Sequence, residues 1–305
     1  MFDLIIIGGS AAATSAGIYA ARRALNFRMI TKDFGGEVAT SGEIDNYPGI
    51  PGTNGIELAD KFKKHLANYG VIPEEGVEVK KITRQADGTF IINTEKEGRD
   101  IKYAARAVIV ATGVHPRELS IPGEKEFRNK GVSYCTVCDG PVFGGKTVAI
   151  VGGGNSALEA GLMMAEIASK VYMLNKNPEF KGDTILLDNL KTKKNVEFIY
   201  NAKTTQIVGD KFVTGLKYDQ EGEREIKAEG IFVHIGMLPN SGVVSEDIQK
   251  NNYGEIVVDK NCQTNVPGLY AAGDVTDAPF KQIIMAAAQG TCALLSAVQY
   301  LNKTK

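Results

Sequence analysis

The feature that most constrains this chain is an opening pattern of strand, glycine turn and helix. Residues 4–7 are a short apolar run, residues 8–10 form a glycine-bearing turn, and small residues over 11–21 suit a helix packed closely on a sheet. Such runs are typical of parallel strands that are buried on both faces. Because residues 27–31 read as the next strand, the segment predicts a βαβ unit.

The same pattern returns in the middle of the chain. Residues 147–151 predict a strand, 152–154 a turn, 155–168 a helix and 170–174 the next strand. One glycine motif alone is weak support for nucleotide binding, whereas two copies in the same context are stronger. The 305 residues therefore predict an α/β protein with two Rossmann-like, three-layer nucleotide-binding domains.

The two turns match the dinucleotide-binding pattern G-x-G-x-x-G/A to different degrees. The six residues from Gly152 to Ala157 fit it without exception. In the first turn Ser10 and Ala13 replace the second and third glycines, and both are small enough for a phosphate to reach the helix N-terminus. A plain buried turn between strand and helix is the alternative interpretation in each case.

The residue at the end of the strand that follows a glycine turn helps to distinguish an NAD site from an NADP site. An NAD site usually has Asp or Glu at the end of that strand to hold the ribose hydroxyls. The second unit has Asn175 there, followed by Lys176 and, five residues later, Lys181. The two lysines could face the 2′-phosphate of NADP as point charges. The alternative is that both are solvated surface lysines.

The sharpest chemical signal is the pair Cys135 and Cys138, spaced as C-x-x-C and followed by Asp139. In a reducing compartment such a pair is typical of a redox disulfide, in which one thiol is acidic. Asp139 could exchange the proton that thiol–disulfide exchange requires. Two alternatives remain: half of a zinc site, which needs two further ligands, and an inert pair.

The other cysteines and histidines do not strengthen the zinc alternative. The chain has three histidines and no second C-x-x-C, so we expect no metal site. Cys262 and Cys292 stand alone in the sequence, and each is predicted to be an ordinary core or surface residue.

A carboxylate also follows an apolar strand near the C-terminus. Gly273 and Asp274 come directly after residues 269–272 and before a helix. A carboxylate at the carboxyl end of a strand can accept hydrogen bonds from a polyol bound in the crevice there. Capping of the next helix is the alternative.

Composition and charge limit the partners and the cellular location to be expected for the protein. The formal net charge is −1, which argues against nucleic acid and anionic membranes as partners. No secretory signal is visible at the start of the sequence. Residues 283–301 are apolar but interrupted by polar side chains, which favours a buried helix over a membrane span. We therefore expect a soluble, cytoplasmic protein.

Taken together, these motifs resemble low-molecular-weight thioredoxin reductases, and the chain is also similar to the flavoprotein portion of the alkyl hydroperoxide reductase flavoenzyme. A C-x-x-C-D-G just before the second glycine turn separates this family from relatives with cysteines near the first turn. The resemblance covers essentially the whole chain; its matching stretches are 44–49, 111–113, 135–141, 152–157, 236–240, 271–275 and 281–283.

The resemblance implies a role for each motif. Cys138 would lie against a flavin, Cys135 would attack the disulfide of a partner protein, and Asp139 would be the acid/base. FAD would be lined by Gly8, Ser10, Ala11, Ala12, Gly36, Glu37, Val38, Asn46, Val79, Ala111, Thr112, Gly113, Gly273, Asp274, Lys281, Gln282 and Ile283. NADPH would be lined by Gly152, Gly154, Asn155, Ser156, Ala157, Lys176, Lys181 and Gly236.

The resemblance also implies an arrangement of domains. Residues 1–116 and 244–305 would form the FAD-binding domain. Residues 117–243 would be an inserted NAD(P)-binding domain that carries the C-x-x-C. The partner would be thioredoxin or a glutaredoxin-like protein, and the protein would be a homodimer.

The sequence departs from the family at three places, and the last of them leaves the electron donor open. Ser10 and Ala11 replace Gly-Pro, and Glu37 replaces glutamine. The His-Arg-Arg and downstream Arg that bind NADPH in the family are here Asn175-Lys176-Asn177 and Lys181. The first hypothesis is an NADPH-dependent thioredoxin reductase. The alternatives are the same disulfide chemistry with NADH, ferredoxin or another flavoprotein as donor, and a non-catalytic nucleotide-binding scaffold.

Overall fold

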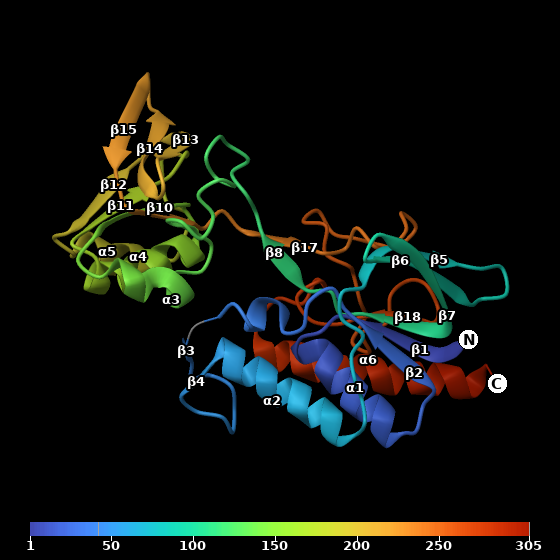
Figure 1. Ribbon diagram of the computed structural model, residues 1–305. Coiled ribbons are helices and arrows are strands. Elements are labelled where there is room, and N and C mark those ends of the chain that lie inside the picture. The colour runs from blue at the N-terminus through green and yellow to red at the C-terminus, as the bar shows by residue number, and fades with distance from the viewer. Residues whose placement is uncertain (42, 305) are drawn as a thin grey trace. The chain divides into compact units, whose positions relative to one another are not determined.

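The computed structural model describes residues 1–41 and 43–304, with the backbone alone for Glu43 and Cys138. The chain forms two compact units (Figure 1). Unit 1 consists of Met1–His115 and Leu238–Lys305, and unit 2 of Pro116–Met237. The chain crosses between them twice, and the two crossing strands, β8 (Val114–Pro116) and β17 (Met237–Pro239), pair with each other.

Unit 1 is built on a six-stranded sheet of order β2-β1-β7-β6-β5, with β18 paired to β7. The strands β2, β1, β7 and β18 run parallel, while β6 and β5 continue antiparallel from the first half of β7. Its strands are β1 (Phe2–Ile7), β2 (Phe27–Ile30), β5 (Glu78–Arg84), β6 (Phe90–Lys96), β7 (Arg99–Val110) and β18 (Leu269–Ala271).

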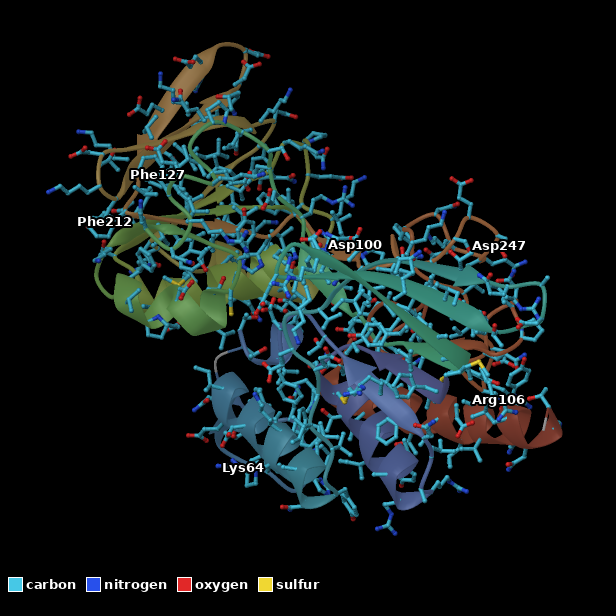
Figure 2. All side chains as sticks on the ribbon, turned by 45° about the vertical axis from the view of Figure 1, so that its right-hand side comes forward. Lys64, Asp100, Arg106, Phe127, Phe212 and Asp247 are labelled. Atoms are coloured by element: carbon cyan, nitrogen blue, oxygen red, sulfur yellow. The ribbon has the colours of Figure 1, made fainter. Side chains whose placement is uncertain are left out.

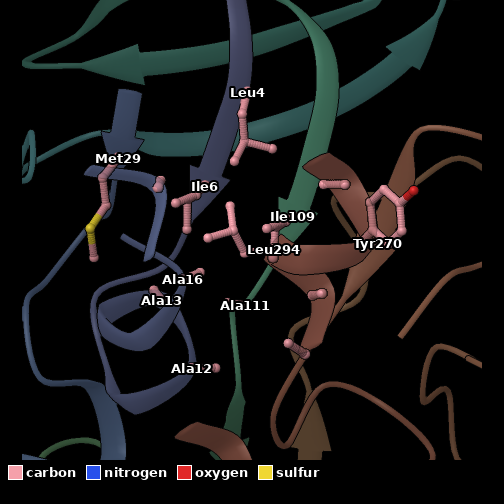
Figure 3. Packing of buried hydrophobic residues seen from close by; sticks show 14 of the residues in the cluster. Leu4, Ile6, Ala12, Ala13, Ala16, Met29, Ile109, Ala111, Tyr270 and Leu294 are labelled. Carbon is pink, nitrogen blue, oxygen red and sulfur yellow. The ribbon is translucent and has the colours of Figure 1, made fainter. Parts of the chain in front are cut away.

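Helices α1 (Ala11–Arg22), α2 (Gly55–Asn68) and α6 (Ile283–Lys303) lie on one face of this sheet (Figure 1). Leu4 and Ile6 of β1 belong to the core on the helical side, whereas Ile5 and Ile7 belong to the core on the other side. Figure 3 shows the helical side, where small residues of α1 pack on the sheet. Burial on both faces accounts for the unbroken apolar run of β1.

Smaller elements complete unit 1. The 3-10 helix η1 (Gly36–Val38) and the short strands β3 (Glu43–Ile44) and β4 (Thr53–Asn54) lie between β2 and α2. The side chain of Asn54 caps α2 by accepting a hydrogen bond from the N–H of Glu57 over 2.9 Å. An N-cap of this kind fixes where the helix begins.

Helix α6 is long and apolar enough to cross a membrane by length and composition alone. However, Ala293, Leu294 and Ala297 are fully buried in the core that α6 shares with α1 and the sheet. At its C-terminal end, Arg106 of β7 donates to the carbonyl of Leu301 over 3.1 Å and pairs with Asp3 over 3.1 Å (Figure 2). One face of the helix thus packs in the core of unit 1, whereas most of its residues are partly buried or exposed.

Unit 2 repeats the same architecture. Its five-stranded parallel sheet has the order β12-β11-β10-β16-β9, and a three-stranded antiparallel sheet has the order β13-β14-β15. The strands are β9 (Val132–Ser133), β10 (Thr147–Val151), β11 (Lys170–Leu174), β12 (Val196–Ile199), β13 (Lys203–Gly209), β14 (Val213–Asp219), β15 (Glu223–Lys227) and β16 (Gly230–Val233). The helices are α3 (Thr136–Asp139), η2 (Gly140–Phe143), α4 (Asn155–Ile167) and α5 (Thr184–Lys191).

The parallel sheet of unit 2 is again buried on both faces. Val148 and Ile150 of β10 pack with residues of α4 and α5, and Ala149 and Val151 pack with the antiparallel sheet. This gives three layers: helices, parallel sheet and antiparallel sheet. The predicted fold class, α/β with Rossmann-like three-layer domains, is confirmed.

Three local features differ from the sequence expectation. Strand β15 has no apolar run from which to predict it, because every residue except Ile226 is exposed. Residues 255–259, Glu-Ile-Val-Val-Asp, contain an apolar run typical of a strand, yet the structure shows only isolated bridges at Ile256. The chain returns to unit 1 between Met237 and Leu238, before the expected boundary at residue 243. Asn240 is already hydrogen-bonded to Thr112 of unit 1, and Val244 is buried in the core of that unit.

Candidate functional site

The first glycine turn joins the end of β1 to the start of α1 and lies against the end of β7. Gly8 has a φ of +139°, and its N–H donates to the carbonyl of Ile30 over 2.9 Å. A Cβ on Gly8 would lie 2.1 Å from the carbonyl oxygen of Ala111. Since no side chain fits at that distance, glycine is required, and the turn brings Gly8 and Ala111 together.

The N-terminus of α1 is suited to an anion. Ser10 is the N-cap residue, its side chain makes no capping hydrogen bond, and the first helical turn carries no acidic residue. Ala11 and Ala12 are buried and too short to cover the N–H groups. The first N–H groups of a helix have no intrahelical partner, and the helix dipole adds positive potential there. The residues present therefore fit the pyrophosphate of FAD.

The 3-10 helix η1 lies beside this turn. Gly36 adopts a φ of +53°, and a Cβ on it would lie 3.4 Å from Cβ of Ser10. Val38 is buried, and the Glu37 carboxylate accepts a hydrogen bond from the hydroxyl of Thr40 over 3.3 Å. The predicted FAD residues of segment 36–38 are thus neighbours of the predicted residues of the first turn.

The loop after β7 is held by a residue that sequence reasoning missed. Asn240 donates from Nδ2 to the carbonyl of Thr112 over 2.8 Å, and its own carbonyl accepts from the Thr112 hydroxyl over 2.9 Å. The backbone N–H of Asn240 also donates to the carbonyl of Gly113 over 2.9 Å. Asn240 belongs to a stretch that resembles the family, which was the available signal.

The ends of β18 and α6 close the same edge of the sheet. Gly273 has a φ of +80°, and a Cβ on it would lie 3.2 Å from Cβ of Ala12. The N–H of Gly273 donates to Oε1 of Gln289 over 2.8 Å. One residue further along α6, a Cβ on Gly290 would lie 1.9 Å from the carbonyl oxygen of Ala12. Small residues therefore let α6 lie directly against the turn between β1 and α1.

Asp274 follows Gly273 directly, and its carboxyl group is partly removed from solvent. Burial raises its pKa, and the nearby Lys281 opposes this. Lys281 itself pairs with Glu255 over 2.8 Å and donates to the carbonyl of Thr276. No hydrogen bond to the Asp274 carboxylate occurs among the described residues. Asp274 is therefore free to accept from a polyol, whereas the ammonium of Lys281 is already bound by its own chain.

Two further predicted residues meet although they are far apart in the sequence. Nδ2 of Asn46 donates to Oε1 of Gln282, the N-cap residue of α6, over 3.2 Å. Ile283 is the first residue of that helix. Val79 lies on β5, away from these contacts, and is paired with Thr94 of β6.

The end of β2 carries an acidic residue that was also missed. Asp33 follows Thr31 and Lys32, and the hydroxyl of Thr31 donates to the carbonyl of Asp33 over 2.7 Å. A Cβ on Gly9 would lie 2.7 Å from Oγ1 of Thr31. An acidic residue about 20 positions after the glycine turn is the usual ribose ligand in this motif, so the spacing rule was the available signal.

The second glycine turn repeats the geometry of the first. Gly152 has a φ of +152°, its N–H donates to the carbonyl of Leu174 over 2.9 Å, and a Cβ on it would lie 2.0 Å from the carbonyl oxygen of His234. Gly154 is the N-cap residue of α4, which has no side-chain cap and no acidic residue in its first turn. That first turn consists of Asn155, Ser156 and Ala157. A dinucleotide pyrophosphate fits here as well.

Asn175, at the expected ribose position, is turned inward. It is 3 % exposed; its Nδ2 donates to the carbonyl of Glu179 over 2.6 Å, and its Oδ1 accepts from the N–H of Asn177 over 3.1 Å. A Cβ on Gly153 would lie 2.6 Å from Nδ2 of Asn175. Asn175 therefore shapes the loop after β11 and has little capacity left for a ribose.

The exposed cations of that loop are Lys176 and Lys181. Neither forms an ion pair among the described residues, and the N–H of Lys181 donates to the carbonyl of Gly153 over 2.7 Å. The loop is closed by Asp183, whose carboxylate accepts from Asn155 over 3.0 Å. Gly236, also predicted to contact the nucleotide, has a φ of +102° just after β16.

The redox motif spans the start of α3. Cys135 is disulfide-bonded; the side chain of Cys138 lies outside the described part of the chain. The hydroxyl of Ser133 donates to Oδ2 of Asp139 over 2.5 Å and accepts from the N–H of Cys135 over 3.0 Å. Ser133, which sequence reasoning missed, thus links the predicted acid/base to the backbone of the predicted nucleophile.

A half-buried histidine, the residue directly after β16, contacts the redox motif. Nε2 of His234 lies 2.6 Å from Oγ1 of Thr136, the residue after Cys135, and Thr136 is 3 % exposed. Burial lowers the pKa of His234 to about 4. The imidazole is therefore neutral at neutral pH and holds the first turn of α3 by a hydrogen bond between uncharged groups.

This histidine predicts how stability depends on pH. Its folded-state pKa lies below the unfolded value, so the unfolded chain binds the extra proton first, and stability is lost as pH falls from about 6.5 toward 4. Between pH 7 and pH 5 we expect a loss of about 2 kcal/mol from this group. The loss should be absent from His234→Gln, as measured by urea unfolding at both pH values.

The exposed His65 supplies the control for that measurement. His65→Gln should lose stability with falling pH as the unaltered protein does, because this substitution leaves His234 and its surroundings in place. An unchanged pH slope in His234→Gln would contradict the role assigned to burial of this histidine.

Comparisons with known proteins agree with this geometry. Residues 2–290 match the family described as pyridine nucleotide-disulphide oxidoreductase. The chain is 42% identical over 310 residues to the F subunit of alkyl hydroperoxide reductase from Escherichia coli, covering 100% of this chain and 59% of that protein. It thus spans about three fifths of that relative's length.

Solved structures of thioredoxin reductases align over nearly the whole chain. The enzyme of Lactococcus lactis has a TM-score of 0.82 at 30% identity, covering 99% of this chain and 100% of the other. The enzyme of T. acidophilum has a TM-score of 0.80 at 37% identity, covering 100% and 99%. Identity at this level over full length extends the likeness beyond the fold.

Proposed function

Since the chain belongs to the pyridine nucleotide-disulphide oxidoreductase family, we propose that it is an NADPH-dependent reductase of protein disulfides that works through Cys135 and Cys138. One observation carries the proposal: Cys135 is disulfide-bonded at the start of α3, in a unit that repeats the nucleotide-binding turn of unit 1. The natural partner is thioredoxin or a glutaredoxin-like protein, which offers an accessible disulfide. We place the protein in the cytoplasm as a homodimer.

Unit 1 supplies the FAD site in this proposal. The N-terminus of α1 holds the pyrophosphate, Asp274 accepts from a hydroxyl of the ribityl chain, and Asp33 accepts from the ribose. Gly8 and Gly273 let the backbone approach the cofactor closely. When bound, FAD supplies a two-electron relay between the nicotinamide and the dithiol.

Unit 2 supplies the dithiol chemistry. The Cys135 thiolate attacks one sulfur of the partner disulfide, which forms a mixed disulfide and expels one partner thiolate. Asp139, oriented by Ser133, gives that thiolate a proton. The Asp139 carboxylate next takes the proton of the Cys138 thiol, and the Cys138 thiolate attacks the sulfur of Cys135. This restores the intramolecular disulfide and expels the second partner thiolate, to which Asp139 passes that proton. Two electrons and two protons pass to the partner.

Lys176 and Lys181 support NADPH as the donor. Both side chains are exposed on the loop after β11, and neither forms an ion pair within the described chain. The backbone contact of Lys181 with Gly153 holds this loop beside the second glycine turn. The 2′-phosphate is the group that would pair with them. A second candidate, reduced ferredoxin or another flavoprotein as donor, is favoured by Asn175, whose side chain is bonded within its own loop and has little capacity left for a nicotinamide nucleotide's ribose.

The donor is tested by anaerobic titration of the FAD-loaded protein with NADPH and NADH in parallel. We expect NADPH to bleach the flavin, and the paired substitution Lys176→Glu and Lys181→Glu to raise the half-saturating NADPH concentration by at least about tenfold, because two charged contacts are lost. NADH titrations should be unaffected by the paired substitution. The readout is flavin absorbance.

The exposed Lys194, outside this loop, provides the matched control: Lys194→Glu should leave the NADPH titration unchanged. Equal NADPH dependence in the paired variant and the unaltered protein would remove the two lysines from the site. A flavin that reduced ferredoxin bleaches and NADPH does not would replace the first candidate by the second.

A further inference from the structure

The two cysteines outside the redox motif are 30 positions apart in the sequence, and both belong to unit 1, Cys262 as a buried core residue and Cys292 as a half-buried one. Cys292 lies in α6, and its thiol donates to the carbonyl of Lys260 over 3.5 Å. Cys262 belongs to the core that α6 shares with α1 and the sheet, Cys292 packs against that core, and Lys260 is only two residues from Cys262. We propose that Cys262 and Cys292 are a second, oxidisable dithiol, which closes to a disulfide that ties α6 to the turn at residues 259–263.

The turn is preformed to present Cys262 to the helix. Oδ1 of Asp259 accepts from the N–H of Asn261 over 2.8 Å and from that of Gln263 over 2.9 Å, and its carbonyl accepts from the N–H of Cys262 over 2.9 Å. These bonds hold Cys262 at a φ of +60°, a conformation that side chains other than glycine seldom adopt. The strained turn thus places one sulfur against α6.

The two cysteine side chains differ in their exposure to solvent. Cys262 is 4 % exposed and packs in the core shared with Ala293 and Leu294, whereas Cys292 is half-buried at the edge of that core. Burial, followed by the neighbouring Cys292, raises the pKa of Cys262 to about 12. An oxidant from solvent therefore meets Cys292 first, and Cys262 serves as the resolving thiol.

A hydroperoxide is the chemical class of oxidant that fits this order. The Cys292 thiolate attacks one peroxide oxygen, which breaks the O–O bond and gives a sulfenic acid and, with hydrogen peroxide, hydroxide. The sulfur of Cys262 then displaces the sulfenic hydroxyl, and its proton leaves with that group as water. Two thiols lose two electrons and two protons, and hydrogen peroxide becomes two waters.

The position of the pair gives the disulfide a structural consequence. Gly290, two residues before Cys292, lies against the carbonyl of Ala12 in the first nucleotide turn, and α6 starts at the contact of Gln282 with Asn46. A cross-link from α6 to residues 259–263 closes a chain loop of about 30 residues, which restricts the unfolded state. We expect the Tm of unit 1 to rise by roughly 5 °C on oxidation.

The test uses the full chain, loaded with FAD, in which Cys135→Ser and Cys138→Ser remove the other thiols. After stoichiometric hydrogen peroxide, intact mass should fall by about 2 Da, reactive thiols should drop from two to none, and peptide mapping should join residues 262 and 292. The rise in Tm should reverse with dithiothreitol. None of these readouts depends on the electron donor or on reductase activity, so a failure here is distinct from a failure of the proposed function.

Two controls share that background. Either Cys292→Ala or Cys262→Ala, added singly to that protein, should abolish the mass loss and the rise in Tm. Two separate variants are made so that the test still stands if one of them does not fold. Three results would overturn the proposal: two thiols that persist after oxidation, a mass gain of about 32 Da from sulfinic acid at Cys292, or a cross-linked dimer in place of the internal disulfide.

Discussion

Cys135→Ser is expected to lower protein-disulfide reductase turnover by at least about a thousandfold, because a serine hydroxyl neither forms a disulfide nor ionises near neutral pH. The measurement is reduction of a thioredoxin-like protein disulfide by the FAD-loaded variant with saturating donor. The variant should still bind FAD, since Cys135 belongs to unit 2 and the residues that fit FAD belong to unit 1. Flavin reduction by the donor should also persist.

Cys292→Ser is the matched control for that loss. It replaces a half-buried thiol outside the redox motif by a hydroxyl of similar size, so turnover should stay within about twofold of that of the unaltered protein. If Cys135→Ser retained a tenth or more of the turnover, the dithiol would have to be removed from the proposed mechanism.

Gly8→Ala is expected to yield protein with less than about a tenth of the normal FAD content, because the new Cβ would lie 2.1 Å from the carbonyl oxygen of Ala111. The backbone at Gly8 has a φ of +139°, which an alanine adopts only under strain. Displacing the ends of β1 and β7 moves the N-terminus of α1, where the pyrophosphate would bind. We expect a loss of roughly 3 kcal/mol in stability as well.

The ratio of flavin to protein absorbance measures FAD content, and thermal unfolding measures stability. Gly242→Ala is the control in the same unit, since a Cβ there meets no atom within 4 Å and its φ is not in the left-handed region. Its FAD content should equal that of the unaltered protein. Full FAD occupancy in Gly8→Ala would show that the first turn is not the pyrophosphate site.

Local patterns predicted the units of this fold well. The strand at residues 147–151 and the next at 170–174 match β10 and β11 to the residue, and the first turn and helix match β1 and α1 closely. Each rests on short-range signals: an apolar run, a glycine that no side chain can replace, and small residues on a helix. The assignment of the individual FAD and NADPH ligands stays a prediction.

Local patterns did not predict which residues each functional side chain would contact. Asn175 reads as an open ribose position, yet it is turned inward because backbone groups of its own loop and the second glycine turn surround it. Ser133 carries no motif of its own, and it matters because β9 ends beside α3, where its hydroxyl reaches Asp139.

The sequence by itself determined the two units of strand, glycine turn and helix and their order, since those depend on residues that are neighbours along the chain. Only the tertiary structure decided that Thr136 meets His234 and that Cys262 and Cys292 pack at one core. The physical reason is that such meetings follow from how separate strands and helices pack, and no pattern within either segment specifies the side chain that the other will present.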